Sequence, residues 1–333
     1  MSPPSQTNLS ALSTEPDLGD DDREKQKLLA KLSSVPSGND TLEISPVFAG
    51  LRLEDLSSRA GEIAASFETN GIVVLKGILA GRSVYEDYRA DLKGLLSVLM
   101  QERLHQTTNP HDSLHDLLLK VFQTEPYLPR YVHDLGTHPM KLLTGNLLKH
   151  QPDILSVVRA SHGPQSVIAS PTGSDNLLFF FPGKSFEKYA LPLHQDFPYL
   201  MQAAAQITVW IPLTARFEGV GGFSGWLGSH KLGICKNRLG SYGLEVAISE
   251  AELDKFEPFS VQWDVGDVVI SHSLLLHKSE PNVTPDKVRA VQIFRFSNLM
   301  TSEAKAYMWQ STAYQSTKGS VTFAEVYPQL IIA

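Results

Sequence analysis

The sequence lacks the features that mark secreted, membrane-spanning and nucleic-acid-binding proteins. Its single cysteine, Cys235, cannot form an internal disulfide, which fits a reducing compartment, so we predict a cytoplasmic protein. No apolar run approaches the roughly 18–20 residues of a membrane span, and the first residues lack the basic start and apolar stretch of a secretory signal. The 29 Lys and Arg residues are outnumbered by 36 Asp and Glu residues, which gives a net charge of −7. This balance argues against a nucleic-acid partner, because phosphate contacts are made by clustered basic side chains.

Aromatic residues are absent from residues 1–45, which are rich in Ser, Pro, Asn, Asp and Glu. Such a segment buries too little apolar surface to offset its ordering entropy, so we predict a disordered N-terminal tail. Residues 46–333 are long enough to bury a sizeable core, and we interpret them as one domain. We expect this domain to act on a small molecule, with no nucleic-acid or membrane partner, as a monomer or homodimer.

The predicted domain has two parts with different hydrophobic patterns. Over about 50–165, apolar residues such as Leu56, Ile63 and Phe67 recur at helical spacing, and Asn70-Gly71 ends the first helix. Over about 166–300, short runs of Val, Ile, Phe and Trp alternate with turn residues, which is typical of a sandwich or barrel. We therefore predict a mainly β fold with helices (α+β), in which N-terminal helices buttress an antiparallel β core. The predicted helices cover 56–67, 84–103, 113–122, 138–149 and 153–160, and the predicted strands 72–75, 166–169, 177–181, 193–196, 207–212, 223–227, 259–263, 268–273 and 290–296.

One histidine motif stands out, His194-Gln195-Asp196. In a strand, residues i and i+2 point to the same face, so a strand here would present His194 and Asp196 side by side. His277 follows another predicted strand and offers a third ligand. Two histidines and one carboxylate, with open positions on one face, form the facial triad of non-haem Fe(II) oxygenases. The simpler interpretation is a strand-end histidine paired with its neighbouring aspartate.

Arg289 makes the oxygenase hypothesis more specific, because it enters the strand that follows His277. A dicarboxylate that chelates a metal through one end leaves a second carboxylate, and the planar fork of a guanidinium matches that group in two hydrogen bonds. Ser279 adds a hydroxyl donor close to His277. The alternative for Arg289 is an ordinary surface arginine on a strand.

A second group of histidines lies in a predicted helical region. His105, His111 and His115 occur near Asp112 and Asp116. A metal cluster is one interpretation, but a solvated helix face explains the pattern more simply, and we favour it.

Further motifs surround the oxygenase residues in a characteristic order. They are Phe67-Glu68-Thr69-Asn70-Gly71-Ile72-Val73-Val74-Leu75, His194-Gln195-Asp196, Trp210-Ile211-Pro212-Leu213-Thr214, Leu227-Gly228-Ser229-His230-Lys231, Gly266-Asp267, and His277-x-Ser279-x-Pro281-Asn282 followed by Arg289. Together they resemble the phytanoyl-CoA dioxygenase family. The resemblance covers roughly residues 55–300 and is dense over 190–296.

This resemblance implies a double-stranded β-helix (jelly-roll, cupin-like) core and an enzyme that uses Fe(II), 2-oxoglutarate and O₂. Such a dioxygenase would oxidise, by default hydroxylate, an unactivated C–H bond of a small molecule and release succinate and CO₂. By resemblance, iron is held by His194, Asp196 and His277, the distal carboxylate of 2-oxoglutarate by Arg289 and Ser279, and the site is lined by Gln195 and Trp210. The segment 218–226 is more glycine-rich than the family pattern, so no substrate is inferred from it. A cupin-type metal enzyme that does not use 2-oxoglutarate and a non-catalytic β-barrel binding protein remain alternatives.

Overall fold

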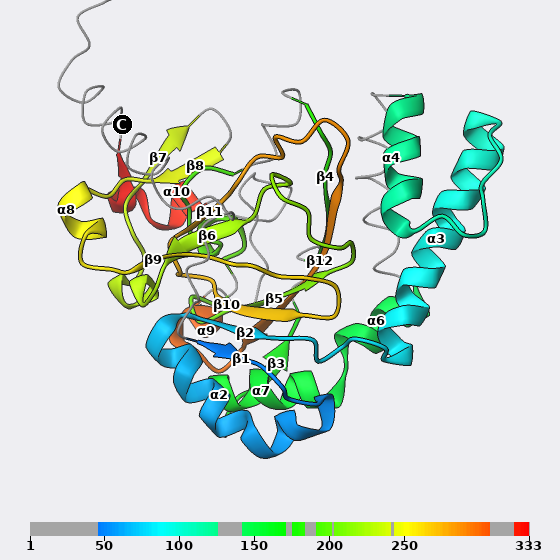
Figure 1. The fold of residues 1–333 in the computed structure, drawn as a ribbon. Coiled ribbons are helices and arrows are strands. Elements are labelled where there is room, and N and C mark those ends of the chain that lie inside the picture. Colours follow the sequence, from blue (N-terminus) through cyan, green and yellow to red (C-terminus); the bar gives the residue numbers. More distant parts are fainter. Residues whose placement is uncertain are drawn as a thin grey trace, which may run out of the picture.

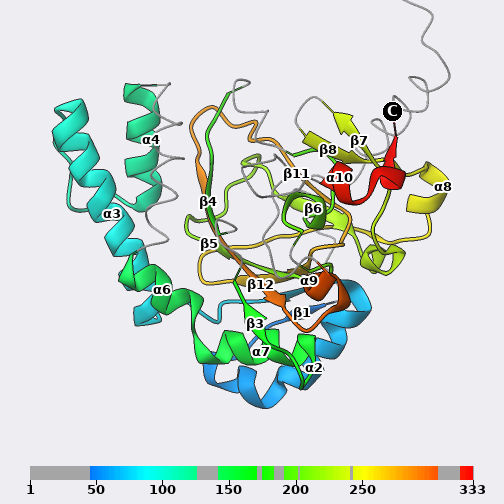
Figure 2. The same ribbon diagram turned by 180° about the vertical axis from the view of Figure 1, so that it is seen from behind.

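The computed structural model describes residues 46–125, 142–170, 175–183, 191–201, 203–240, 243–306 and 323–332. The predicted tail over residues 1–45 lies outside the described residues, as does the first part of the predicted helix over 138–149. Figure 1 shows a β core with helices below it and to one side, and Figure 2 shows the same arrangement from behind. Among the described residues, no helix combines the length and the apolarity that a membrane span requires.

The largest sheet has the strand order β1-β2-β10-β5-β12-β3, with β4 also paired to β12. All its pairings are antiparallel except that of β1 with β2. A second sheet has the order β11-β6-β9, and a third the order β13-β7-β8. The strands are β1 (Val47–Phe48), β2 (Ile72–Leu75), β3 (Ile168–Ala169), β4 (Asn176–Phe180), β5 (Ile207–Pro212), β6 (Phe223–Trp226), β7 (Asn237–Gly240), β8 (Gly243–Val246), β9 (Pro258–Ser260), β10 (Val268–His272), β11 (His277–Ser279), β12 (Arg289–Asn298) and β13 (Ile331–Ile332).

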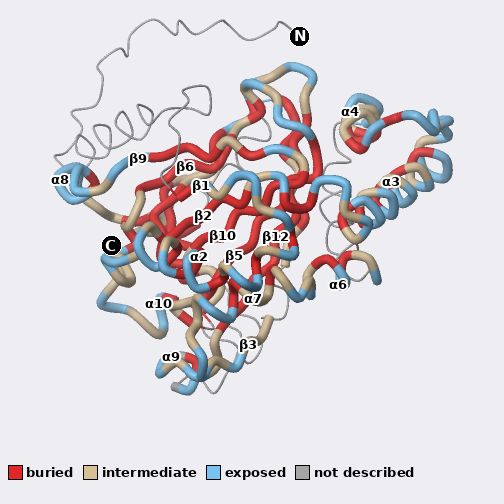
Figure 3. The backbone as a smooth tube through the Cα atoms, turned by 60° about the horizontal axis from the view of Figure 1, so that its bottom comes forward, coloured by how far each residue is buried: buried red, intermediate tan, exposed pale blue. Residues whose placement is uncertain are grey.

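Side-chain alternation along β12 separates two cores. Val291 and Ile293 point between the sheets, where they pack with Phe223 of β6 and Phe259 of β9. Ala290, Phe294 and other residues of the opposite face pack against the helices. The central strands are accordingly buried, apart from the last residue of β10 and of β12, as Figure 3 shows for β2, β10, β5 and β12. Two facing antiparallel sheets of this kind form the double-stranded β-helix that the sequence predicts.

The helices cover the outer face and one flank of the large sheet (Figures 1 and 2). Helices α2 and α7 pack against each other and against the sheet, whereas α3, α4 and α6 lie beside β4 and β12. Gly71 ends α2 in the left-handed conformation at φ 76°, and a Cβ there would lie 2.5 Å from Nδ1 of His230, so the glycine is required sterically. The α-helices are α2 (Leu56–Asn70), α3 (Ser83–Leu104), α4 (Leu114–Thr124), α6 (Leu143–Lys149), α7 (Pro152–His162), α8 (Glu250–Leu253), α9 (Ser302–Ala306) and α10 (Phe323–Val326), and the 3₁₀ helices η1 (Leu53–Asp55), η4 (Phe197–Tyr199), η5 (Ser229–Leu232) and η6 (Pro328–Leu330).

The structure confirms most predicted elements and corrects a few. The predicted strand over 193–196 is wrong, because only His194 pairs there, in an isolated bridge with His277, and Asp196 already has helical dihedrals at the start of η4. The predicted strand over 259–263 is shorter and shifted, since β9 is Pro258–Ser260. The hairpin of β7 and β8 went unpredicted because charged residues such as Arg238 and Glu245 interrupt its apolar pattern.

The Gly266-Asp267 turn has a structural role at the base of β10. The carboxylate of Asp267 is buried and accepts hydrogen bonds from the main-chain nitrogens of Gly77 at 2.8 Å and Asp264 at 2.7 Å, and from Lys76 Nζ. Gly266 approaches Ala80 so closely that a Cβ would lie 2.8 Å from its nitrogen. This turn therefore joins β2 to β10 and holds the edge of the sheet in register.

Two half-buried histidines make the fold sensitive to acid. Burial lowers the pKa of His162 to about 4 despite a hydrogen bond to the main chain of Phe296. Burial, followed by the charges of His230 and His162, lowers the pKa of His272 to about 3. Both rings are therefore neutral in the native state, whereas they take up a proton near pH 6.5 in the unfolded chain. Their contribution to stability is complete above pH 6.5 and is lost as the pH falls toward 4.

We expect His162→Asn and His272→Asn to flatten this pH dependence, because asparagine keeps a hydrogen-bonding group near the Nδ1 position but cannot be charged. Between pH 7.5 and pH 5, each variant should lose about 1–2 kcal/mol less unfolding free energy than the unmodified protein. Urea unfolding at both pH values measures the difference. The exposed His111→Asn is the matched control and should leave the pH dependence unchanged. An equal loss of unfolding free energy between pH 7.5 and pH 5 in the unmodified protein and all three variants would show that other groups control acid stability.

Candidate active site

Three ligand-type side chains converge at one end of the space between the sheets. His194, Asp196 and His277 each offer one atom, and these atoms lie within 4.8 Å of one another. Oδ1 of Asp196 is 3.7 Å from Nε2 of His194 and 3.8 Å from Nε2 of His277. Ligand bonds of about 2.0–2.2 Å allow two ligands of one ion to be at most about 4.4 Å apart, and both Asp196 distances lie within that limit. All three side chains are buried.

The backbone brings the ligands together by a route other than the predicted one. His194 and His277 form an isolated antiparallel bridge, in which each main-chain nitrogen donates to the carbonyl of the other, at 2.9 and 3.1 Å. Asp196 does not continue a strand, because the chain turns into η4 at this residue. The turn, rather than strand alternation, carries its carboxylate back to the two imidazoles.

Hydrogen bonds define which nitrogen of each imidazole is available. Nδ1 of His194 lies 2.7 Å from the carbonyl oxygen of Pro192, and Nδ1 of His277 lies 2.9 Å from that of Leu275. A carbonyl can only accept, so both Nδ1 atoms carry the proton and both Nε2 atoms keep a lone pair. Nε2 of His277 has no hydrogen-bond partner in the part of the chain that the structure describes. Such orientation by main-chain carbonyls is usual for metal-bound histidine.

The two oxygens of Asp196 have different surroundings. Oδ1 faces the imidazoles, whereas Oδ2 accepts a hydrogen bond from Thr208 Oγ1 at 2.9 Å and lies 3.5 Å from Arg295 Nη2. Burial alone would raise the pKa of Asp196, but the positive charge of Arg295 holds it well below its usual range. The carboxylate is therefore ionised, as a metal ligand must be.

Aromatic rings enclose the ligand His277. Its imidazole centroid is 4.8 Å from the ring of Phe223 and 6.3 Å from that of Trp210, whose Nε1 donates to Ser271 Oγ at 2.8 Å. Burial, followed by the charge of His194, lowers the pKa of His277 to about 3. The ring is therefore neutral near pH 7 and able to bind a metal.

Arg289 lies on the same inward face of β12 as Val291 and Ile293. Its guanidinium is buried over the ring of Phe180, with a centroid distance of 3.8 Å, and borders a cavity of about 390 Å³ together with Trp263. Nε and Nη1 have no hydrogen-bond partner among the described residues. Burial lowers the pKa of Arg289 to about 9, opposed by the charge of Glu280, so the side chain stays cationic at neutral pH. A buried cation with unused donors is a binding site for an anion.

The remaining predicted site residues take different positions. Ser279 shares a face of β11 with His277 and is paired with Phe223 of β6. Gln195 is fully buried, and its amide bonds to the backbone, donating to the carbonyls of Gly233 and Leu274 and accepting from the nitrogen of Cys235. Gln195 thus supports the loop that carries His194 and Asp196.

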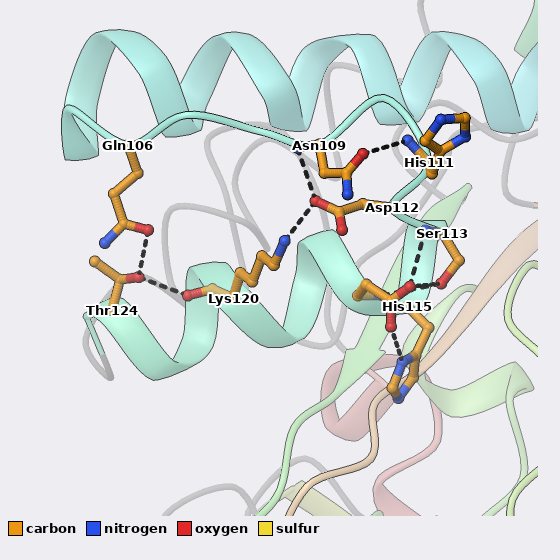
Figure 4. Close-up of polar contacts among 9 residues, drawn as sticks. Gln106, Asn109, His111, Asp112, Ser113, His115, Lys120 and Thr124 are labelled. Atoms are coloured by element: carbon orange, nitrogen blue, oxygen red, sulfur yellow. Dashed lines mark hydrogen bonds and ion pairs between the residues drawn. The ribbon is translucent and has the colours of Figure 1, made fainter.

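The histidines near α4 do not form a metal site (Figure 4). Asp116 accepts from Ser113 in the capping box of α4, and Asp112 accepts from Asn109 and Lys120, so both carboxylates are already used. His115 contacts Asp116 at 3.3 Å and packs on Phe217. Among the described residues, the only cluster with metal-ligand geometry is that of His194, Asp196 and His277.

Sequence reasoning missed two residues that touch the triad, Thr208 and Arg295. Both follow from alternation, because Thr208 shares a face of β5 with Trp210, and Arg295 shares a face of β12 with Arg289. The signal was present, but a charged residue within a strand is ordinarily assigned to the solvent side.

Comparison with known proteins identifies the family. The family model described as Phytanoyl-CoA dioxygenase (PhyH) matches residues 67–291, which is more than half of the chain. The chain belongs to the phytanoyl-CoA dioxygenase family. This membership confirms the resemblance seen in the motifs, and with it an enzyme of the dioxygenase class that depends on Fe(II), 2-oxoglutarate and O₂.

Two curated relatives and one solved structure are similar over most of their length. The chain is 25% identical over 277 residues to a 1-deoxypentalenic acid 11-beta-hydroxylase of Streptomyces exfoliatus, with 76% of this chain and 87% of the relative covered. It is 24% identical over 274 residues to the enzyme of the same name from Streptomyces arenae, with the same coverage. The epimerase SnoN, solved with Fe³⁺, alpha-ketoglutarate and nogalamycin RO, superposes with a TM-score of 0.50 at 17% identity, covering 72% of this chain and 84% of SnoN. The similarity to SnoN concerns the fold alone, and it agrees with the jelly-roll core of this member of the phytanoyl-CoA dioxygenase family.

Proposed function

We propose that this enzyme hydroxylates an unactivated C–H bond of a small molecule, with iron held by His194, Asp196 and His277. We further propose that Arg289, with Ser279, binds the distal carboxylate of 2-oxoglutarate. The observation that carries the proposal is the buried, cationic Arg289, which has unused donors and borders a cavity. Its guanidinium lies 5.7 Å from the ring of Trp263, which neighbours Phe223, and Phe223 packs on the ligand His277. A metal site alone would not need such a group.

The residues present fit the two groups that the reaction requires. Two neutral imidazoles and one carboxylate are a donor set suited to ferrous iron, and they leave open positions on one face. The guanidinium of Arg289 matches one carboxylate of a dianion. When bound, Fe(II) and 2-oxoglutarate supply the oxidative chemistry that no amino-acid side chain can provide.

The chain itself supplies orientation and a dry interior. Main-chain carbonyls of Pro192 and Leu275 fix the two imidazoles, and Thr208 fixes the carboxylate. Trp210, together with the rings around it, surrounds the site with apolar surface, which strengthens charge interactions by excluding water. Trp210 therefore shapes the site, and Gln195 supports the ligand loop.

The relatives support the reaction type. Both are named as hydroxylases of a small organic acid, which favours hydroxylation of a small molecule here as well. We propose in addition that residues 46–333 form one oxygenase domain behind a disordered tail, and that the protein acts in the cytoplasm as a monomer or homodimer. The single cysteine supports a reducing compartment, which also keeps iron ferrous.

An anaerobic titration tests the proposal. We expect addition of Fe(II) and then 2-oxoglutarate to give the visible charge-transfer band of the chelate, which neither component gives with the protein alone. Succinate formation after admission of O₂, scored across a metabolite panel, then identifies the substrate. Folded, iron-loaded protein without the band would favour a cupin-type enzyme that does not use 2-oxoglutarate. Failure to bind iron would favour a non-catalytic binding protein.

A further inference from the structure

Arg295 is held in place independently of the metal ligands. It is buried, and its main-chain nitrogen donates to Asp175 Oδ1 at 3.1 Å. With the amide of Asn176 oriented so that its oxygen faces Arg295, that oxygen accepts from Nη1 at 3.2 Å. Asp175 in turn pairs with Lys149 of α6. The guanidinium therefore presents Nη2 to Asp196 from a fixed support.

Thr208 approaches the same oxygen of Asp196 from the neighbouring strand. Residues Thr208 of β5 and Arg295 of β12 are paired directly across the sheet, so their side chains emerge side by side on the inward face. The Thr208 hydroxyl and the Arg295 guanidinium both reach Oδ2, at 2.9 and 3.5 Å, whereas Oδ1 faces the two imidazoles. The two oxygens of one carboxylate are thus separated into a supported atom and an available atom.

We propose that Thr208 and Arg295 are positioning residues that keep Asp196 a one-oxygen metal ligand. This inference rests on the proposed function, because the triad is taken to bind the metal. A carboxylate whose two oxygens are both available can chelate a cation through both. A second oxygen from Asp196 would occupy a coordination position that 2-oxoglutarate or O₂ needs. Holding Oδ2 with a hydroxyl and a guanidinium prevents this and preserves the open face of the site.

Cobalt(II) is the probe, because its visible spectrum reports ligand number without turnover. We expect Thr208→Val and Arg295→Met to bind Co(II) but to change its spectrum in the same direction, as Asp196 contributes a second oxygen. The affinity of the Co(II)-loaded protein for 2-oxoglutarate should fall about 10-fold in Thr208→Val and up to about 100-fold in Arg295→Met, the range over which groups supporting a metal ligand affect activity. Thr208→Ser keeps the hydroxyl and should restore both readouts.

The matched control is Tyr88→Phe, which removes a buried hydrogen bond to Gln292 on the opposite face of β12. It should leave the Co(II) spectrum and the 2-oxoglutarate affinity unchanged. Unaltered spectra and affinities in Thr208→Val and Arg295→Met would overturn the inference. Loss of Co(II) from folded variants would also overturn it, because Thr208 and Arg295 would then be needed for Asp196 to bind the metal at all, not for the number of oxygens that it contributes. If Arg295→Met does not fold, the comparison of Thr208→Val with Thr208→Ser tests the inference.

The same titrations separate this inference from the proposed function. Wild-type protein that binds Co(II) but not 2-oxoglutarate would contradict the proposed function, while the Co(II) spectra of the variants would still test the role of Thr208 and Arg295. Wild-type protein that binds no Co(II) would contradict both.

Discussion

Replacing Arg289 with alanine is expected to raise the KM for 2-oxoglutarate by about 30-fold or more while iron binding persists. Truncating one partner of a buried, hydrogen-bonded charge pair costs about 2–5 kcal/mol, which corresponds to about 30-fold or more in affinity. The guanidinium is buried over Phe180 and is not part of the cluster of His194, Asp196 and His277, so the metal ligands should stay in place. Succinate formation against 2-oxoglutarate concentration gives the KM, and anaerobic Fe(II) titration gives the metal affinity.

Two further variants make the result specific. Arg289→Lys keeps the charge but loses the two-pronged fork, so its KM should fall between those of the wild type and Arg289→Ala. Lys287→Ala removes a nearby positive charge that does not line the cavity, and should change the KM little. A parallel loss of iron in folded Arg289→Ala would mean that Arg289 is structural and not a co-substrate ligand.

Replacing Asp196 with alanine is expected to abolish hydroxylation and to weaken metal binding by about 100-fold or more. The substitution removes one of three protein ligands, and it takes away the carboxylate that lies 3.5 Å from Nη2 of the buried Arg295. Because removing one partner of a buried ion pair costs about 3–5 kcal/mol, the variant should also be less stable. Asp196→Asn retains the shape and a hydrogen-bond acceptor for Thr208, so it should show the loss of metal affinity with a smaller loss of stability.

Asp267→Asn is the matched control for both effects, because Asp267 is also buried and accepts several hydrogen bonds, from Gly77 and Asp264 among others, rather than from a triad residue. It should lower the unfolding midpoint without a specific change in metal affinity. Isothermal titration with Co(II), urea unfolding and succinate release cover the three readouts. Wild-type turnover in Asp196→Asn would remove Asp196 from the triad.

The regular part of the fold was predictable because alternation and helical spacing report burial directly. Strand β5 matches the predicted range, β12 extends it, and α2 ends at the predicted Asn70-Gly71. The triad residues could be chosen by type and order, but their geometry could not. The strand expected around His194 is replaced by one bridge and a turn, since the conformation at Asp196 depends on packing that local sequence does not encode.

The support around the site was harder to predict for a related reason. Arg295 appears in a strand as a charge, and burial of a charge depends on a partner from elsewhere in the chain. The main-chain acceptors at Pro192 and Leu275 carry no sequence signal at all, because every residue has a carbonyl. The sequence therefore shows which residues have the right chemistry, but it does not show which distant residues pair with them.

The reciprocal bridge between His194 and His277 also bears on how such an enzyme can evolve. Two main-chain hydrogen bonds hold the ligand-bearing residues face to face, so their spacing does not depend on the length of the loops between them in the chain. The loop 213–222 can therefore gain or lose residues without displacing the metal ligands. A bridge of two hydrogen bonds thus leaves the chemistry constant while the surrounding loops are free to diversify toward new substrates.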